Sequence, residues 1–463
     1  MRLLALPTLF LAFALILTAC GGGTPTAAVG GTSSSSAPAS SAPSTSASTA
    51  PSTSAAPATS AAPATSAAPS TGAAPTTGTG ASTAPATRTT ATGTTTVAGT
   101  ATRPSGSATP SASAGTSPNT SIKIAGPYPG EANTLNGQGS SFVAVLFSNY
   151  FDQYSKLTNV KVNYQGSGSG AGKKAVTDQT GDFAASDSPM SNDELAAAQA
   201  KCGDIVLHIP VTLGNVVVTY NVKGLENTKL KLDGDTIAAI FLGNITSWND
   251  QKIKDQNPGV NLPNADITVV HRSDGSGTTD TFTSWLAAVN TAWANGPKSG
   301  TSINWPTGIG ASGNQGVAGE LNNNPNSIGY VELAYANQQK LPFADVKNAA
   351  GKYITPSNAS ITAAGAAFAP SAPADLRLKI VNAPASAPDA YPIAGITWVL
   401  VCPKQTDQAK AVALTRMLWW AIHEGQQYNE GLDYARIPNE FVVKGEAFIN
   451  QITVNGQKAF PGK

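Results

Sequence analysis

The stretch ITVVHRSDGSGTTDTFTSWLAAV, residues 267–289, joins a β-branched apolar run to a helical pattern through a turn of small polar residues. The run from Ile267 to His271 predicts a strand. The apolar residues that recur at helical spacing after the turn are Phe282, Leu286, Val289 and Trp293. The stretch therefore predicts a strand, a turn and a helix in direct succession.

Two other stretches repeat this design. The strand-like run 160–165 leads into GSGSGAGKK, residues 166–174, and then into a short helix. Ser140 and Ser141 precede an amphipathic helix, and we expect a Ser to cap it. The runs 216–221 and 396–401 predict buried strands. Alternating strands and helices favour an α/β fold.

The first 20 residues, MRLLALPTLFLAFALILTAC, combine one basic residue, an apolar run and small residues before Cys20. This pattern is typical of an export signal. Its ending resembles the lipobox of bacterial lipoproteins, in which the Cys becomes the mature N-terminus and carries lipid. The alternative is an ordinary cleaved signal that ends in Cys. A lipidated chain would be anchored to the membrane without spanning it.

Residues 21–122 are predicted to form a disordered tether. From Gly21 to Thr120 the sequence is almost entirely Ser, Thr, Ala, Pro and Gly, which cannot bury enough apolar surface to fold. The tether can act as a spacer through a cell-wall layer or provide slack alone, and the sequence favours neither.

The formal net charge is +1, and Arg2, Arg88 and Arg103 precede the folded part. The folded part is therefore slightly acidic, which argues against nucleic-acid binding. Its length predicts two lobes. In an exported protein, Cys202 and Cys402 can form a disulfide or remain two buried free thiols.

The three turns suggest a site for an anion. Helix N-termini present unsatisfied N–H groups and the positive end of the helix dipole, and Gly, Ser and Thr add close approach and hydroxyl donors. Three convergent helix starts can surround one tetrahedral oxyanion. The turns lack the P-loop, G-x-G-x-x-G and G-x-S-x-G patterns, and no H-E-x-x-H occurs, so no cofactor, metal or catalytic nucleophile is expected. Lys173 and Lys174 are expected to form a solvated face.

Acidic residues near such a site predict selectivity. An ionised carboxylate only accepts hydrogen bonds, so it repels a fully ionised oxyanion but accepts from one that keeps a proton. At neutral pH phosphate keeps a proton and sulfate does not, so an Asp in the site wall would favour phosphate. An Asp beside Arg272, such as Asp274, would instead fix the guanidinium by a bidentate pair.

Four stretches occur in an order that closely resembles the phosphate-binding protein of the high-affinity ABC phosphate uptake system. They are LNGQGSSF (135–142), VNYQGSGSGAG (162–172), DFAASDSPMS (182–191) and VVHRSDGSGTT (269–279). The stretches 232–250 and 326–336 extend the resemblance, which runs from about Leu135 to the C-terminus. It implies a two-lobed fold of the periplasmic-binding-protein type, with a ligand cleft and two hinge crossings.

The resemblance also implies the residues that hold phosphate. Asp187 would accept the phosphate proton, and Asp274 would pair with Arg272. This chain has Ser141 where the family commonly has Thr, and it lacks the usual Pro after Phe142. The implied donors are Ser141, Phe142, Ser169, Arg272, Ser276, Gly277 and Thr278.

The implied lobes are residues 131–213 with 397–463, and residues 214–396. The implied function is an extracytoplasmic, lipid-anchored receptor that captures inorganic phosphate and delivers it to the permease subunits of an ABC transporter, as a monomer and not as an enzyme. Alternatives are a receptor for arsenate, which also keeps a proton, a phosphate-ester hydrolase, or a cell-surface interaction protein.

Overall fold

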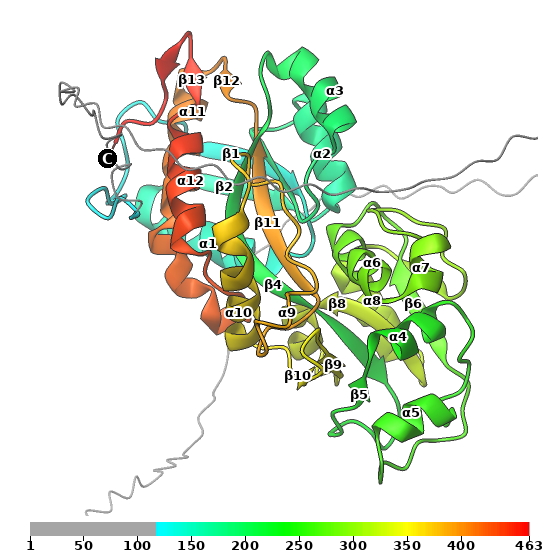
Figure 1. Cartoon of the computed structure of the whole chain (residues 1–463). Helices are drawn as coiled ribbons and strands as arrows, with labels where there is room; N and C mark the ends of the chain where they lie inside the picture. Colours follow the sequence, from blue (N-terminus) through cyan, green and yellow to red (C-terminus); the bar gives the residue numbers. More distant parts are fainter. Residues whose placement is uncertain (1–116, 463) are drawn as a thin grey trace, which may run out of the picture. The chain divides into compact units, whose positions relative to one another are not determined.

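The computed structural model of the chain describes residues 117–462. All of these residues fall in one compact unit. Strands and helices alternate along it (Figure 1), which confirms the predicted α/β class. The predicted signal peptide, Cys20 and the tether up to residue 116 lie outside the described residues.

The largest sheet of residues 117–462 has eight strands in the order β2-β1-β3-β11-β4-β8-β6-β7. β2, β1 and β3 run parallel to one another, as do β8, β6 and β7, whereas β11 and β4 run antiparallel to their neighbours. These strands are β1 (Thr134–Gly139), β2 (Lys161–Gln165), β3 (Phe183–Ser186), β4 (Leu207–Asn221), β6 (Thr268–Arg272), β7 (Ile309–Ala311), β8 (Ser327–Glu332) and β11 (Ala394–Val401).

β4 joins the two ends of this sheet (Figure 1). From Leu207 to Asn215 it pairs with β11, and from Val216 to Asn221 it pairs with β8. We call β2, β1, β3, β11 and the first part of β4 the first sheet half, and the second part of β4 with β8, β6 and β7 the second sheet half. The predicted lobe boundaries, 213/214 and 396/397, lie beside this change of partner and stay a prediction.

Helices follow most of the strands, and two expectations about them are wrong. α1 begins after Val143, and no side chain caps it, so neither Ser140 nor Ser141 is its cap. The helix of the opening stretch ends at Val289, and Trp293 belongs to α7, which Asn290 caps. The helices are α1 (Ala144–Thr158), α2 (Ser169–Asp178), α3 (Asn192–Cys202), α4 (Gly234–Phe241), α5 (Gln251–Gln256), α6 (Gly277–Val289), α7 (Thr291–Asn295), α8 (Gly313–Asn323), α9 (Leu333–Gln338), α10 (Asn358–Phe368), α11 (Gln408–Ile422) and α12 (Asn439–Ile449).

Short elements complete the described unit. Two three-stranded sheets contain β5 (Lys231–Leu232), β9 (Asp345–Lys347) and β10 (Tyr353–Ile354), and β12 (Lys404–Gln405), β13 (Thr453–Val454) and β14 (Gln457–Lys458). The 3-10 turns are η1 (Ala369–Ser371), η2 (Glu424–Tyr428) and η3 (Glu430–Leu432). Cys202 at the end of α3 and Cys402 after β11 are joined by a disulfide, with their Cα atoms 5.2 Å apart.

The segment before β1 is bound to α11 and α12. Arg416 of α11 is buried and forms an ion pair with Glu131 at 2.6 Å, and its second terminal nitrogen donates to the carbonyl of Gly126 at 2.6 Å. The backbone N–H of Asn119 donates to the carboxylate of Glu446 at 2.6 Å. These contacts begin before residue 122, where the predicted tether ends.

Candidate functional site

The carboxyl ends of strands from both sheet halves supply the candidate site. β1 and β3 are parallel neighbours, so the residues after them, Ser140 and Asp187, meet at one edge. In the second sheet half, β6 ends at Arg272 and its turn leads into α6. Because several chain segments end here with short polar side chains, many donors converge on a small volume.

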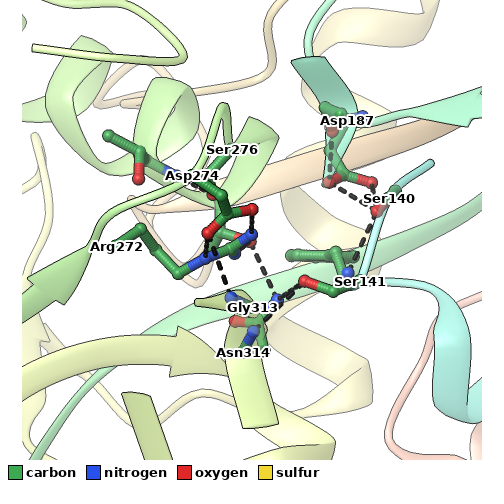
Figure 2. Close-up of polar contacts among 12 residues, drawn as sticks. Ser140, Ser141, Asp187, Arg272, Asp274, Ser276, Gly313 and Asn314 are labelled. Atoms are coloured by element: carbon green, nitrogen blue, oxygen red, sulfur yellow. Dashed lines mark hydrogen bonds and ion pairs between the residues drawn. The ribbon is translucent and has the colours of Figure 1, made fainter. Parts of the chain in front are cut away.

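Asp187 is held by hydroxyl groups on several sides. Ser140 Oγ donates to both of its carboxylate oxygens at 2.6 and 2.7 Å, Thr397 Oγ1 donates to Oδ1 at 2.7 Å, and Ser169 Oγ donates to Oδ2 at 3.1 Å. Figure 2 shows Ser140 beside Asp187. Burial raises the pKa of Asp187 to about 6, although these hydrogen bonds and the charge of Arg272 act to lower it. At neutral pH the side chain is therefore a largely ionised, buried acceptor.

Arg272 lies opposite, paired with Asp274. Nε donates to Oδ1 at 2.7 Å, and Nη2 donates to Oδ2, so the pair is bidentate (Figure 2). Burial opposes ionisation of Asp274, but the hydrogen bonds and charge of Arg272 outweigh burial and lower its pKa. The backbone N–H of Gly313 also donates to Asp274, at 3.0 Å. The guanidinium is thus fixed, and Nη1 reaches Thr278 Oγ1 at 3.3 Å.

Ser276, in the turn between β6 and α6, caps α6. Its Oγ accepts from the backbone N–H of Thr279 at 3.0 Å. Gly277 and Thr278 occupy the first turn, where N–H groups have no acceptor inside the helix. A Cβ added to Gly277 would lie 2.6 Å from Asp187 Cβ, so the helix start can approach Asp187 only because this residue is Gly.

Ser141, Phe142 and Ser169 also lie at this site. Ser169 is the first residue of α2, and its Oγ accepts from the backbone N–H of Asp187 at 3.0 Å as well as donating to the carboxylate. The backbone N–H of Phe142, expected to donate to a ligand, donates in this structure to Ser140 Oγ at 3.0 Å. The Ser141 hydroxyl accepts from Asn314.

The site is closed to solvent. All eight predicted donor and acceptor residues are buried. The glycine-rich turn contacts the turn after β6, because Gly170 N–H donates to the carbonyl of Gly275 at 2.8 Å. Tyr335 of α9 donates to the carbonyl of Ser141 at 2.7 Å. Residues of both sheet halves therefore enclose the site.

Several residues of this network were missed by the sequence reasoning. In the structure, Asn314 bonds to Ser141 and Thr397 bonds to Asp187. Ser140, expected as a possible helix cap, donates to Asp187 instead. Asn314 follows β7 at the start of α8, within the stretch IGASGNQG (309–316), which repeats the design of a strand followed by small residues. That signal could have identified Asn314. Thr397 lies inside a buried strand, where no local pattern distinguishes it.

Lys173 departs from its expected position. Lys174 is exposed, but Lys173 is buried and donates to Ser188 Oγ at 3.1 Å, with Glu194 also at 3.1 Å.

Within residues 117–462, no cluster of three or more His, Cys, Asp and Glu residues is arranged to hold a metal ion. Among the helices described, none has both the length and the apolar character needed to cross a membrane.

Comparisons with known proteins agree on a family. The family model of the PBP superfamily domain matches residues 35–414. The phosphate-binding protein PstS of Xylella fastidiosa is 39% identical over 314 residues, which cover 68% of this chain and 84% of that protein. The phosphate-binding protein PstS 3 of Mycobacterium tuberculosis is 38% identical over 331 residues, which cover 70% of this chain and 88% of that protein.

Solved structures show the same fold. A high-affinity periplasmic phosphate-binding protein, PfluDING, solved with bound phosphate, superposes with a TM-score of 0.53 at 22% identity, covering 68% of this chain and 93% of its own. The phosphate-binding protein from Stenotrophomonas maltophilia gives a TM-score of 0.54 at 20% identity, with coverage of 68% and 94%. The chain therefore belongs to the PBP superfamily and, within it, to the PstS family of phosphate-binding proteins.

Proposed function

We propose that this protein captures inorganic phosphate outside the cytoplasm and delivers it to an ABC transporter. The observation that carries the proposal is the position of Asp187, a buried acceptor fixed by three hydroxyls among a set of donors. Phosphate near neutral pH offers one proton to such an acceptor, and its other oxygens need donors. Sulfate offers no proton, so its oxygen would face the carboxylate without a hydrogen bond.

The donors come from both sheet halves. Arg272 supplies positive charge, and the start of α6 supplies the N–H groups of Gly277 and Thr278. Ser141, Phe142 and Ser169 bind from the first sheet half, and Ser276 from the second. When phosphate binds, Phe142 N–H would exchange its bond with Ser140 Oγ for the ligand, and the Ser169 O–H would exchange its bond with Asp187 Oδ2. Asp274 keeps the guanidinium of Arg272 in place without touching the ligand.

Opening and closing of the two sheet halves is the binding step in this proposal. Because the site residues are buried, phosphate must enter an open form and be enclosed as the halves close. The lobes 131–213 with 397–463, and 214–396, would then turn about β4 and β11. Buried donors bind an anion more strongly than exposed ones, because water does not compete for them.

The location and partners rest on the family and on the leader. The relatives named above are phosphate-binding proteins. Lipidation of Cys20 would anchor the protein at the outer face of the membrane, as a monomer that presents phosphate to permease subunits. We also propose that it is a receptor and not an enzyme, because the relatives named above are phosphate-binding proteins and the hydroxyls of Ser140 and Ser169 hold the carboxylate of Asp187 in place.

Titration calorimetry of the mature chain with phosphate, arsenate and sulfate near pH 7.5 tests this function. We expect a phosphate dissociation constant of about 1 µM or lower, which corresponds to about 8 kcal/mol. Sulfate should bind at least about 100-fold more weakly, because it leaves the carboxylate unsatisfied. Tight sulfate binding, or no phosphate binding, contradicts the proposal. Equal affinity for arsenate would extend it to both protonated oxyanions.

Matched arginine variants locate the site. Arg272→Gln should weaken phosphate binding at least about 100-fold, because it removes a charged donor. Arg436→Gln is the control, because Arg436 is exposed and pairs only at the surface with Glu430 at 3.3 Å. Equal phosphate affinities of the two variants would show that Arg272 does not bind the ligand. A chromogenic phosphate ester tests the enzyme alternative, and sustained hydrolysis by the metal-free protein would establish it.

A further inference from the structure

Asn314 connects two of the proposed phosphate donors. It lies at the start of α8, fully buried, and its side-chain Nδ2 donates to Ser141 Oγ at 3.1 Å and to Thr278 Oγ1 at 3.0 Å. Its backbone N–H also donates to Ser141 Oγ, at 3.1 Å. Figure 2 shows Asn314 directed at Ser141 beside the Arg272–Asp274 pair. Ser141 belongs to the first sheet half and Thr278 to the second.

The orientation of the Asn314 amide is fixed by a donor on its other side. The backbone N–H of Glu332 donates to Asn314 Oδ1 at 3.0 Å. A backbone N–H can only donate, so the amide atom that faces Glu332 must be the oxygen. The two N–H bonds of Nδ2 must then point toward the hydroxyls of Ser141 and Thr278.

These contacts decide which way the two hydroxyls can bond. A hydroxyl has two acceptor positions and one O–H donor. Ser141 Oγ uses both acceptor positions for the two N–H groups of Asn314. Thr278 Oγ1 uses both for Asn314 Nδ2 and for Arg272 Nη1, the latter at 3.3 Å. Each hydroxyl is left with its O–H proton alone, so each can bond to a ligand only as a donor.

We propose that Asn314 is a positioning residue that makes the hydroxyls of Ser141 and Thr278 obligatory donors to the bound oxyanion. The inference rests on the proposed phosphate function and deepens it. Because the contact with Ser141 crosses between the sheet halves, the donor orientation is completed only on closure. Asn314 thus makes the closed form, and not the open one, complementary to an acceptor ligand.

Two substitutions at Asn314 separate orientation from packing. Asn314→Asp keeps the shape but places an acceptor oxygen against both hydroxyls, which would then turn their protons away from the ligand. Phosphate binding should weaken at least about 100-fold at pH 8, as for the loss of two donors to an anion. Asn314→Ala removes the two side-chain donors, while the backbone N–H still donates to Ser141 Oγ and Arg272 still donates to Thr278 Oγ1. Each hydroxyl is then only partly oriented, so a loss of about tenfold is expected. A residue that only fills space would show the reverse order.

The dependence on pH gives a second readout. The ratio of wild-type to Asn314→Asp affinity should shrink as pH falls toward 5, because a protonated carboxyl regains an O–H donor. Arg272 and Asp274 from the turn after β6, Glu332 from the end of β8, and Asp187 from the turn after β3 face the same cluster. They are present in both proteins, so the ratio isolates the new carboxyl.

A double-mutant cycle tests whether Asn314 acts through Ser141. In a Ser141→Ala background, Asn314→Ala should cost about threefold in phosphate affinity instead of about tenfold. The reason is that one of the two hydroxyls that Asn314 orients is already absent. The control is Asn337→Ala, which removes an exposed contact between the sheet halves, Asn337 Nδ2 to Asp433 at 2.8 Å, and should change affinity less than about twofold. Thermal unfolding of each variant checks folding, and if the Asp variant does not fold, the Ala cycle carries the test.

The outcomes are distinguishable from those of the proposed function. A wild-type protein that binds no phosphate overturns the function, and this inference with it. If the wild type binds phosphate tightly, three results each overturn the role of Asn314 alone. They are affinities of both Asn314 variants within twofold of wild type, a greater loss for Ala than for Asp, and full additivity with Ser141→Ala.

Discussion

Asp187 combines two properties that oppose each other, deep burial and negative charge. Burial disfavours its ionised form, and the hydroxyls of Ser140, Ser169 and Thr397 favour it. Each hydroxyl donates to the carboxylate, so its oxygens are held in place as acceptors. A carboxylate fixed in this way can recognise a proton on a ligand without moving.

Asp187→Asn is expected to reduce discrimination between phosphate and sulfate. The amide of the variant can donate to an ionised oxygen, so sulfate should gain at least about tenfold in affinity while phosphate loses at least about tenfold. Calorimetry with both anions measures the change. Asp389→Asn is the control, since Asp389 is 80% exposed and pairs only with Lys352. A selectivity ratio that is unchanged in Asp187→Asn would show that another residue recognises the proton.

The raised pKa of Asp187 also predicts how stability depends on pH in the absence of phosphate. Its folded value is about 6, against about 4 in an unfolded chain. Between these values the folded state keeps a proton that the unfolded state releases. The contribution to stability is therefore fully present below about pH 4 and is lost as pH rises through about 6, with a size of up to about 3 kcal/mol.

Urea unfolding of wild type and Asp187→Asn between pH 4 and 8 measures this contribution. The wild type should lose stability relative to the variant as pH rises, because the variant has no proton to release. A difference between the two proteins that stays constant across this range would mean that burial does not raise the pKa of Asp187.

Single residues also show where sequence reasoning stops. Lys173 and Lys174 are adjacent and identical, yet one is buried against Ser188 and the other pairs at the surface with Asp178. The position of each around α2 decides this, and composition does not. Asp187 could be predicted because it lies in a stretch that resembles a family. Thr397 could not, because its contact with Asp187 joins residues 210 positions apart.

At the scale of elements, the turns were predicted better than the ends of the helices. β6, Ser276 and α6 follow one another as the pattern of residues 267–289 indicates. The same reasoning failed for α1, because Ser140 bonds to Asp187, 47 positions away, and is not available as a cap. Local patterns predict local partners, and a residue that serves a distant site departs from them.

The start of α6 must approach Asp187 closely, and Gly277→Ala tests this. The added Cβ would lie 2.6 Å from Asp187 Cβ and 2.6 Å from Ser169 Oγ, so the helix start must retreat. We expect phosphate affinity to fall at least about tenfold, as for one lost hydrogen bond to an anion. Calorimetry measures the affinity, and thermal unfolding shows whether the fold is retained.

Gly319→Ala is the matched control within α8. Nothing lies within 4 Å of the Cβ that would be added there. This variant should bind phosphate like wild type and gain about 0.5 to 1 kcal/mol of stability, because Ala is the better helix former. Normal phosphate binding by Gly277→Ala would show that the approach of α6 to Asp187 is not needed.

At the scale of the whole described unit, continuous strand pairing joins the two sheet halves, and a few hydrogen bonds hold them closed at the site. β4 and β11 pair over most of their length next to the point where β4 changes partner. The closing contacts are few: Asn314 makes two hydrogen bonds to Ser141 Oγ, and Tyr335 makes one to the Ser141 carbonyl, all beside the site. A few hydrogen bonds can break and form again without disturbing the sheet, as a receptor that opens and closes requires.

The segment 117–132 is expected to belong to the folded unit. A chain that starts at residue 117 should keep the phosphate affinity and thermal stability of the mature protein, because it retains the ion pair of Glu131 with Arg416. A chain that starts at residue 133 loses Glu131 and the Gly126 carbonyl, two partners of the buried guanidinium of Arg416. That loss should cost about 3 to 5 kcal/mol of stability. Urea unfolding of the two chains measures the difference, and calorimetry compares their affinities. Equal stabilities would show that the segment only passes over α11, and a weaker affinity of the chain from residue 117 would show that the preceding tract contributes to binding.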